Sequence, residues 1–527
     1  MKARRILLLV AGLVCIATLV LLLPSVRSPE PAEDERVHAV CSSCHFFPTP
    51  DLLPRSVWRA QIEHMAFVVD SPLVDSLRLD FLRVDSLPAD STVLVFDVEG
   101  FIAWYESRAP ERLLMEHAIT RVEPAPLRFD HSSIRLGRAS GPGVATVGRV
   151  GPQLAVPNMA LGSIHLLSWA SGPRLIGQGE HPARVSMGDL DGNGLDDLVI
   201  ADLGNPMPTD DPTGRVLIAL QLQVDEYELR TLAHGIGRVA DVRPLDIDLD
   251  GDLDLVVAAF GYLHEGGVYV LHNESVGDSL DYRPERVIDR AGAVSVIPVD
   301  DLQPGTGPGF VVAFAQQYER VSLFLPRDPA GYEERVLYRA PHPVWGTSNL
   351  TAADLDADGD VDFLLSNGDT LDDGVAFKPY HGVTWLENRG AEDFLAHPIG
   401  RFYGAHAAEA GDLDGDGDLD IVASGFLPQV ELPVPPNAIR FDSVVWFERE
   451  GDAWIPWEIE SGHPRHTGVT LFDLDEDGRL DIVAAVNRAW DAAPTEVGPS
   501  LEVWFNRGNA ASTGSPRPSA SGRPRRP

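Results

Sequence analysis

Acidic side chains recur in five short segments of this sequence at spacings that suit metal binding. Each segment reads D-x-D-x-[D/N]-G-x-x-D, with oxygen-bearing side chains at positions 1, 3, 5 and 9 and a glycine at position 6. The residues are Asp189, Asp191, Asn193 and Asp197; Asp246, Asp248, Asp250 and Asp254; Asp354, Asp356, Asp358 and Asp362; Asp412, Asp414, Asp416 and Asp420; and Asp473, Asp475, Asp477 and Asp481. Oxygen atoms at alternate positions of a tight loop converge on one point, which suits a hard cation. With the position 7 carbonyl added, the pattern predicts about five bound Ca²⁺ ions, and Mg²⁺ is less suited because it keeps more of its water.

An EF-hand is one alternative, because it uses a similar acidic loop, but it also needs a bidentate Glu at position 12 and flanking helices. Position 12 is apolar in every copy here and lies in a short β-rich run: Ile200, Val257, Leu365, Ala423 and Ala484. A strand therefore follows each loop, which excludes the EF-hand. A solvated acidic turn without a cation is the other alternative, but its alternating carboxylates would repel one another.

A different chemistry is indicated by Cys41-Ser42-Ser43-Cys44-His45. In a C-x-x-C-H motif the two thiols bond the vinyl groups of a porphyrin and the adjacent His ligates the iron, so the motif predicts one covalent haem c. A redox disulfide would not need the His, and a zinc site would need further ligands that no second cysteine pair supplies. Cys41, Cys44 and His45 are therefore the predicted haem-binding residues.

The sixth iron ligand is expected on the segment that follows the cysteine pair. Ser56 is suited to cap a helix on which Trp58, Ile62 and Met65 fall on one face. Met65 is the predicted ligand, and Met ligation would raise the haem potential toward that of an electron carrier. His64 is the rival ligand, and a purely structural Met in the core is the other alternative.

Residues 35 to 75 resemble a minimal class of c-type cytochrome module, in which C-x-x-C-H is followed by a Pro-rich loop and a short helix ending in Met. The resemblance implies a small α-helical module that carries the haem. Beyond it, residues 71–88 are expected to form a further helix or a linker. Residues 92–96 and 100–105 are expected to form two strands.

The acidic segments are regularly spaced along the chain. The spacing from Asp189 to Asp473 corresponds to about 57 residues per repeat if a degenerate copy, at 301–313, fills the widest interval. A further copy without acids is expected at 133–156, which gives seven repeats between residues 110 and 507. A repeat of this length suits a four-stranded blade. The predicted fold is therefore mainly β, a seven-bladed β-propeller with calcium-binding hairpin loops, preceded by a small α-helical cytochrome c-like module.

The chain from Asp189 to Val486 resembles the FG-GAP or VCBS-type repeats of integrin-like β-propellers, through the D-x-D-x-D-G-x-x-D motif at blade spacing. The resemblance implies that each ion lies in the hairpin between the first two strands of a blade and has a structural role. It does not define a function, since adhesion proteins, lyases and phospholipases share this fold.

Polar residues shortly before the acidic loops are expected to line the central channel of the propeller. They are Arg184, Asp241, Asn349, His406 and His466, with His131 and Arg135 in the degenerate first copy. The long segments 369–378, 429–440 and 487–500 are expected to cluster on one face, where recognition would occur. Lys378, Tyr380 and His381 adjoin an apolar strand there. They suit either general acid–base chemistry or a buried structural turn.

The ends of the chain differ from its middle. The basic start, Met1 to Arg5, and the apolar run from Ile6 to Leu23 predict a signal peptide or an uncleaved signal anchor over residues 1–28. Residues 29–109 are expected to form the haem module and a linker, residues 110–507 the propeller, and residues 508–527 a disordered basic tail. The protein is thus expected to be exported, periplasmic or at the cell surface, and anchored to the membrane by residues 6–23.

Charge limits the partners. With 79 acidic and 42 basic residues the formal net charge is -37, which argues against nucleic acid as a ligand. The leading hypothesis is a haem c electron-transfer protein whose propeller docks a redox partner. The alternatives are a propeller oxidoreductase that oxidises a small-molecule substrate, such as a sugar or an alcohol, and an adhesion or scaffold protein. The sequence contains no nucleophile elbow, P-loop or dinucleotide fingerprint.

Overall fold

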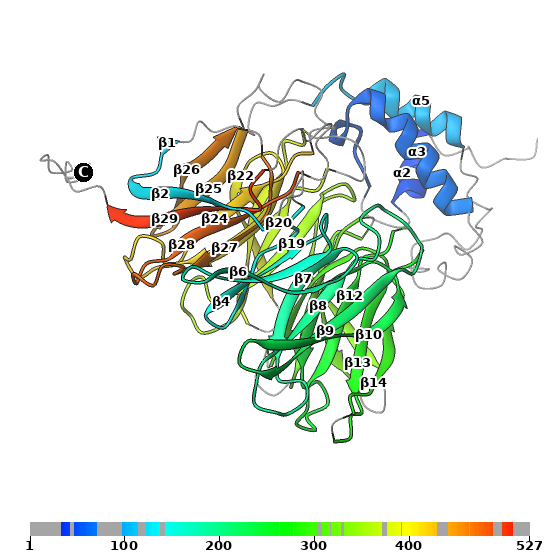
Figure 1. Ribbon diagram of the computed structural model, residues 1–527. Helices are drawn as coiled ribbons and strands as arrows, with labels where there is room; N and C mark the ends of the chain where they lie inside the picture. The colour runs from blue at the N-terminus through cyan, green and yellow to red at the C-terminus, as the bar shows by residue number, and fades with distance from the viewer. Residues whose placement is uncertain are drawn as a thin grey trace, which may run out of the picture.

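The structure is a computed structural model with a group of helices beside a β-propeller (Figure 1). It describes residues 33–42, 47–70, 97–113, 123–136, 143–262, 264–277, 279–300, 302, 307–316, 318–327, 331–370, 377–390, 393–428, 441–462, 464–488 and 498–509. The predicted signal or anchor segment, Cys44, His45 and the basic tail lie outside these residues. In the described part of the chain, no helix has the length and apolar character needed to cross a membrane.

The helical module contains α2 (Glu33–Cys41), the short 3₁₀ helix η1 (Pro50–Leu52), α3 (Arg55–Asp70) and α5 (Val98–Arg108). Trp58 and Ile62 of α3 are completely buried, as expected from their spacing. The Trp58 ring stacks on Tyr105 of α5 at 4.1 Å between ring centroids. Trp58 Nε1 donates to Pro50 O (2.9 Å) and Tyr105 Oη donates to Pro48 O (2.9 Å). The Pro-rich segment after the cysteine pair is thereby fastened to both long helices.

The prediction of a strand over residues 100–105 was wrong, because this segment belongs to α5. A short apolar run does not distinguish a strand from a buried helix by its pattern alone. The cap and the packing decide for the helix: Asp97 accepts a hydrogen bond from Gly100 N (3.0 Å), and Phe101 and Tyr105, one turn apart, are both buried. The expected strand at 92–96 lies outside the described residues.

The strands in the described part of the chain form seven sheets of four antiparallel strands, the blades, numbered here in chain order. Blades 1 and 2 contain β3 (Gly148–Val150), β4 (Gln153–Asn158), β5 (Ser163–Ser168) and β6 (Gly172–Gln178), then β7 (Pro182–Gly188), β8 (Asp197–Asp202), β9 (Gly214–Gln223) and β10 (Glu226–Ile236). Blades 3 and 4 contain β11 (Val239–Leu245), β12 (Asp254–Ala259), β13 (Gly267–Asn273) and β14 (Tyr282–Ile288), then β15 (Ala293–Val299), β16 (Gly309–Phe314), β17 (Arg320–Pro326) and β18 (Tyr332–Arg339).

Blades 5 and 6 contain β19 (Thr347–Ala353), β20 (Asp362–Asn367), β21 (Gly382–Asn388) and β22 (Phe394–Arg401), then β23 (Ala405–Gly411), β24 (Asp420–Gly425), β25 (Phe441–Glu450) and β26 (Ala453–Gly462). A short strand, β1 (Glu123–Pro124), adds to β26 in parallel. Blade 7 contains β27 (His466–Phe472), β28 (Asp481–Val486), β29 (Leu501–Asn509) and β2 (Leu127–Ile134). The seven-bladed propeller predicted from the repeat is thus confirmed.

The blades close into a ring. The first strand of each blade is innermost and contacts the first strand of the next, from β3 around to β27 and back to β3. Apolar cores lie between neighbouring blades. Between blades 3 and 4, for example, Val256 and Val270 pack with Phe310 and Phe324. Each fully buried side chain of this kind contributes about 1.5–3 kcal/mol to folding, so the ring is stabilised mainly by contacts between blades.

One predicted repeat does not form a blade by itself. Residues 133–134 were expected to belong to the first blade, but they end β2, which pairs with β29 in blade 7. The repeat length correctly predicted a strand at these residues. It assigned that strand to blade 1, whereas the strand, β2, belongs to blade 7. A strand from the N-terminal side completes the last blade as its outermost strand and so closes the ring.

The propeller has two chemically different ends. In an antiparallel blade the turn between strands 1 and 2 lies at one end, and the connections from strand 2 to 3 and from strand 4 to the next blade lie at the other. The acidic loops are turns between strands 1 and 2. Val344, on the connection from blade 4 to blade 5, packs against the core of the helical module. The helical module therefore sits at the end opposite the acidic loops, where the second strands of the blades end.

Candidate functional site

Each acidic loop lies where the sequence predicted, between the first and second strands of blades 2, 3, 5, 6 and 7. Position 9 is the first residue of the second strand. The backbone is left-handed at positions 4 and 6 in every copy, and glycine occupies position 6 throughout. The Asp at position 1 accepts a hydrogen bond from the glycine N–H at position 6, at 2.9 Å in the first loop and 3.2 Å in the second. The five loops therefore share one conformation.

The aspartates at position 9 are nearly or fully buried, and both of their oxygens accept backbone hydrogen bonds. In the first loop Asp197 Oδ2 accepts from Leu190 N (2.9 Å) and Oδ1 accepts from Gln221 N on β9 (2.7 Å). The same two contacts recur in the other four copies. This carboxylate joins the acidic loop to the third strand of its blade, a role that the sequence did not reveal.

Three asparagines that the sequence analysis missed support the same junction. Asn273, Asn388 and Asn506 stand on the third strands, where each N–H donates to a position 9 carboxylate. Each also donates from its side-chain Nδ2 to the carbonyl at position 8 of its loop, at 3.2–3.3 Å. These asparagines follow the position 9 Asp by 19, 26 and 25 residues, and Gln221 and Arg449 take their place beside the first and fourth loops, so no fixed spacing marks them in the sequence.

The carboxylates of the loops are placed to hold a cation. Ligand oxygens of three acids lie within 4.8 Å of one another in the first loop, and the second, third and fourth loops contain similar groups. Asp246 Oδ1 is buried without a hydrogen-bond partner among the described residues. Burial raises the pKa of Asp197 and Asp362 to about 6 and that of Asp420 to about 7, since their negative charges are removed from water. A cation in the loop would offset this cost and use the unpaired oxygen, so the donor set fits Ca²⁺.

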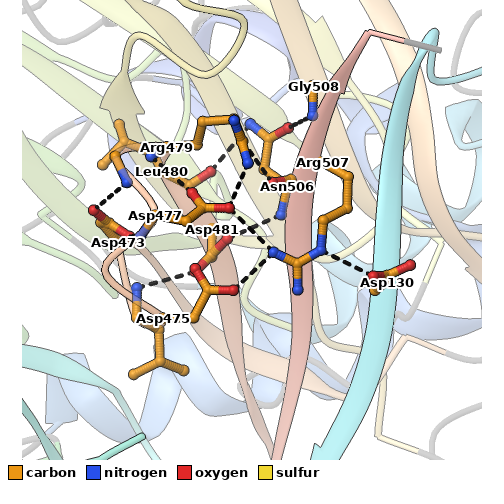
Figure 2. A network of polar contacts seen from close by, with 12 residues as sticks. Asp130, Asp473, Asp475, Asp477, Arg479, Leu480, Asp481, Asn506, Arg507 and Gly508 are labelled. Carbon is orange, nitrogen blue, oxygen red and sulfur yellow. Dashed lines mark hydrogen bonds and ion pairs between the residues drawn. The ribbon is translucent and has the colours of Figure 1, made fainter. Parts of the chain in front are cut away.

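The fifth loop differs because arginines reach its carboxylates (Figure 2). Arg507 of β29 donates from Nη1 to Asp475 Oδ2 (2.7 Å) and Asp477 Oδ2 (3.2 Å), and from Nε to Asp130 Oδ2 on β2 (2.9 Å). Arg479, at position 7, also pairs with Asp477. The same guanidinium thus links the acidic loop to the strand that closes the ring.

The helical module places part of the haem motif. Cys41 ends α2 and is buried in an aromatic core with Trp58 and Tyr105, an apolar setting that suits a porphyrin. Cys44 and His45 lie outside the described residues. Met65 is half-buried on α3, one turn beyond Ile62, whereas His64 is exposed. The position of the Met on the buried stripe favours it over His64 as a ligand.

The central channel is crossed by one arginine. Arg184 of β7 donates from Nη1 to Asp241 Oδ2 (3.0 Å) and Ser295 Oγ (3.2 Å), and from Nη2 to Asn349 Oδ1 (3.0 Å). These partners lie on the innermost strands of blades 3, 4 and 5, and Asp241 is completely buried. Arg184, Asp241 and Asn349 therefore form a polar cross-link between blades.

The other expected channel residues are arranged differently. His406 Nδ1 contacts Thr467 O (2.9 Å), and His466 Nε2 contacts Glu460 Oε2 (2.6 Å), so both contacts join blade 6 to blade 7. His131 and Arg135 are exposed at the outer edge of blade 7, so their assignment to the channel was wrong. His131 lies on β2 and Arg135 directly follows it, and β2 pairs with β29 in blade 7 and not with the strands of blade 1.

Lys378 and His381 lie at the end of the propeller that faces the helical module, and both are almost fully buried. Lys378 Nζ donates to Asp369 O (3.2 Å), and Tyr380 Oη donates to Val344 O (3.1 Å). Glu319, which the sequence analysis did not select, is buried nearby and accepts from Gly346 N (2.9 Å). Burial raises the pKa of Glu319 to about 8, and the charge of Lys378 lowers it in part.

A match to a family model supports the propeller repeat. Residues 367–423 match the family model described as FG-GAP-like repeat. No curated protein shows a significant match to the chain. Sqt1 of Saccharomyces cerevisiae is 13% identical, with a TM-score of 0.42 over 72% of this chain and 100% of that one. A streptogramin B lyase is 10% identical, with a TM-score of 0.44 over 72% and 98%. A virginiamycin B lyase from Staphylococcus aureus is 9% identical, with a TM-score of 0.44 over 72% and 99%. A β-propeller with an FG-GAP repeat suggests a binding or scaffold role.

Position 4 of the acidic loops provides a test of their conformation. Leu249 has φ of 62° and is 71% exposed, whereas the first and fourth loops have glycine at this position. We expect Leu249→Gly to raise the free energy of unfolding by about 0.5–1 kcal/mol, because relief of left-handed strain exceeds the entropy cost of glycine. Urea denaturation would measure the change. Leu222→Gly is the control, because Leu222 is an exposed leucine (51%) on β9, and it should destabilise; an equal loss in both variants would contradict the assignment.

Proposed function

We propose that this protein is an exported haem c electron-transfer protein whose calcium-stabilised propeller docks a redox partner. The observation that carries the proposal is the C-x-x-C-H motif, whose first cysteine is buried in an aromatic core formed with α3 and α5. When bound, haem would supply one-electron chemistry. Cys41 and Cys44 would attach the porphyrin, and His45 would ligate the iron. The apolar residues 6–23 would tether the protein to the membrane.

The helical module would hold the cofactor through this chain's own packing. Trp58 and Tyr105 fasten the Pro-rich segment by hydrogen bonds to Pro50 O and Pro48 O, and so fix the backbone directly after the motif. Trp58 and Ile62 supply an apolar wall that continues to Met65. An apolar wall excludes water from the cofactor, which is one of the factors that set a haem potential.

The propeller would act as the docking body. Its channel is cross-linked by Arg184, which supports a rigid scaffold over an open substrate tunnel. The second strands of the blades end on the side of the ring that carries the helical module. A partner that approaches this end would therefore come close to the cofactor. No nucleic acid is expected as a partner, given the net charge of -37.

A second function, oxidation of a sugar or an alcohol within the propeller, is favoured by one observation. Lys378, His381 and Glu319 are buried together near the helical module and offer groups for proton transfer. Reduction of the haem by a sugar or alcohol, lost in Lys378→Met, would favour this function over partner docking. A third function, adhesion or scaffolding alone, would require that the purified protein lack a c-type haem spectrum.

The haem ligands can be tested by substitution. We expect Met65→Ala to keep the covalent haem, lower the midpoint potential and remove the red absorption band typical of Met-ligated ferric haem, since loss of the thioether removes the ligand that raises the potential. Redox titration followed by absorbance would measure this. His64→Ala is the matched control and should leave both properties unchanged. The reverse result would identify His64 as the ligand.

Calcium binding can be tested by chelation. We expect EDTA to lower the melting temperature, because a ligand that binds the folded state stabilises it, by about 2.7 kcal/mol at one hundred times its Kd. Added Ca²⁺ should restore the melting temperature, and Mg²⁺ should restore it less. Asp248→Asn should lower the number of bound ions by one. A melting temperature that does not respond to EDTA would contradict calcium binding.

The fifth loop is expected to bind Ca²⁺ more weakly than the other four, because Arg507 and Arg479 place positive charge on its carboxylates. Arg507→Gln should therefore tighten the weakest calcium site while loosening the link to Asp130. Isothermal titration calorimetry would resolve this site. Arg389→Gln, which removes an exposed pair with Asp393 outside the loops, is the control. Five equivalent sites in the wild-type protein would contradict the expectation.

A further inference from the structure

A cluster of aromatic and imidazole rings lies on the propeller at the end that faces the helical module. His342 and Trp345 come from the connection between blades 4 and 5, and Tyr380 and His381 precede β21. The His342 ring lies 5.2 Å from Trp345 and 4.4 Å from Tyr380, measured between centroids. Tyr380 also stacks on Trp345 at 5.7 Å and meets His381 at 5.7 Å. Two loops far apart in the sequence thus build one compact group.

Three polar atoms of this cluster are buried without a hydrogen-bond partner among the described residues: His342 Nδ1, Trp345 Nε1 and His381 Nε2. His342 is 7% exposed and His381 is 1% exposed. A buried polar group left unpaired costs about 1–3 kcal/mol, so each of these three atoms is suited to a hydrogen-bond partner from outside the described residues.

The orientation of His381 defines what the occupant must offer. His381 Nδ1 accepts a hydrogen bond from Gly404 N at 3.4 Å, which assigns the ring proton to Nε2. Trp345 Nε1 is a donor in every state. Two of the three unpaired atoms are therefore donors that need an acceptor, and an oxygen acceptor is the simplest match.

The local charge favours a negative acceptor. Lys378 is 2% exposed and lies close enough to lower the pKa of both His342 and His381, in each case after the larger effect of burial. The pKa of His342 falls to about 3, so this imidazole is neutral at ordinary pH. Glu319 is mostly protonated at neutral pH, because burial raises its pKa to about 8. Lys378 is thus a basic side chain beside His342 and His381.

The cluster also borders the helical module. Val344, between His342 and Trp345 in the chain, packs against the apolar core that contains Cys41 and Trp58. The charge of Asp51, in the 3₁₀ helix after the cysteine motif, reaches His342. Tyr380 Oη holds the Val344 carbonyl at 3.1 Å, which fixes the connecting loop between the two parts.

We propose that Trp345 and His381 of this cluster, with the neighbouring Lys378, form the binding site for the carboxylate side chains of the haem carried by the helical module. The inference rests on the proposed haem function and deepens it. The propeller then contributes hydrogen-bond donors and a positive charge to the binding of the cofactor. Because ferric haem carries one more positive charge than ferrous haem, charge on its carboxylates alters the potential.

The test is the midpoint potential of the full-length protein. Trp345→Phe removes the indole donor and keeps a ring against Tyr380, and Lys378→Met removes the positive charge. Both substitutions leave the negative charge of the haem carboxylates less neutralised. Because that charge favours the more positive ferric form, the midpoint potential should fall. We expect about a tenfold change in the ferric-to-ferrous ratio at a fixed applied potential, equivalent to about 59 mV for one electron. Circular dichroism would confirm that each variant is folded.

Trp504→Phe is the matched control, because Trp504 is a buried indole on β29 whose neighbours are His131 and His466 of blade 7. Its potential should equal that of the wild-type protein. A c-type spectrum with unchanged potentials in both Trp345→Phe and Lys378→Met would overturn this inference and leave the proposed function intact. A wild-type protein without a c-type spectrum would overturn the proposed function itself.

Discussion

The aspartate at position 9 of each acidic loop is the contact on which the blades depend. Its carboxylate is buried at the start of the second strand, where one oxygen accepts from the loop backbone and the other from the third strand. Two strands and the loop before them are thereby joined by one side chain. The cost is a buried negative charge, visible in the raised pKa of Asp197, Asp362 and Asp420. A Ca²⁺ ion in the loop would offset that charge.

Closure of the ring is a second constraint, because the blades must be held in register with one another. Polar contacts join the blades both near the axis of the ring and at its outside. Near the axis, Arg184 links the innermost strands of blades 2 to 5. At the outside, Arg507 links the fifth acidic loop to Asp130 on β2. The apolar cores between blades supply most of the stability, but apolar contact does not specify register. Directed ion pairs and hydrogen bonds do so, because they weaken steeply with distance and angle.

The two ends of the propeller have separate roles. The acidic loops gather at one end, where they stiffen the hairpins. The helical module lies at the other end, where Val344 packs against its core and where the unpaired donors of Trp345 and His381 lie. This separation follows from strand alternation: successive turns of an antiparallel blade point to opposite ends. Stabilisation and recognition can therefore change independently.

The sequence by itself determined the repeat, the seven blades, the acidic loops and the buried stripe of α3, because each rests on local spacing that a strand or helix preserves. It did not determine that residues 100–105 are helical, since a short apolar run fits both structures until capping by Asp97 decides. Nor did it place β2, because the choice between the first and the last blade depends on ring closure. The cross-link of Arg184 and the cluster of His342, Trp345 and His381 were decided by tertiary structure alone. Their members come from different blades or loops, and no local spacing records which residues the closed ring brings together.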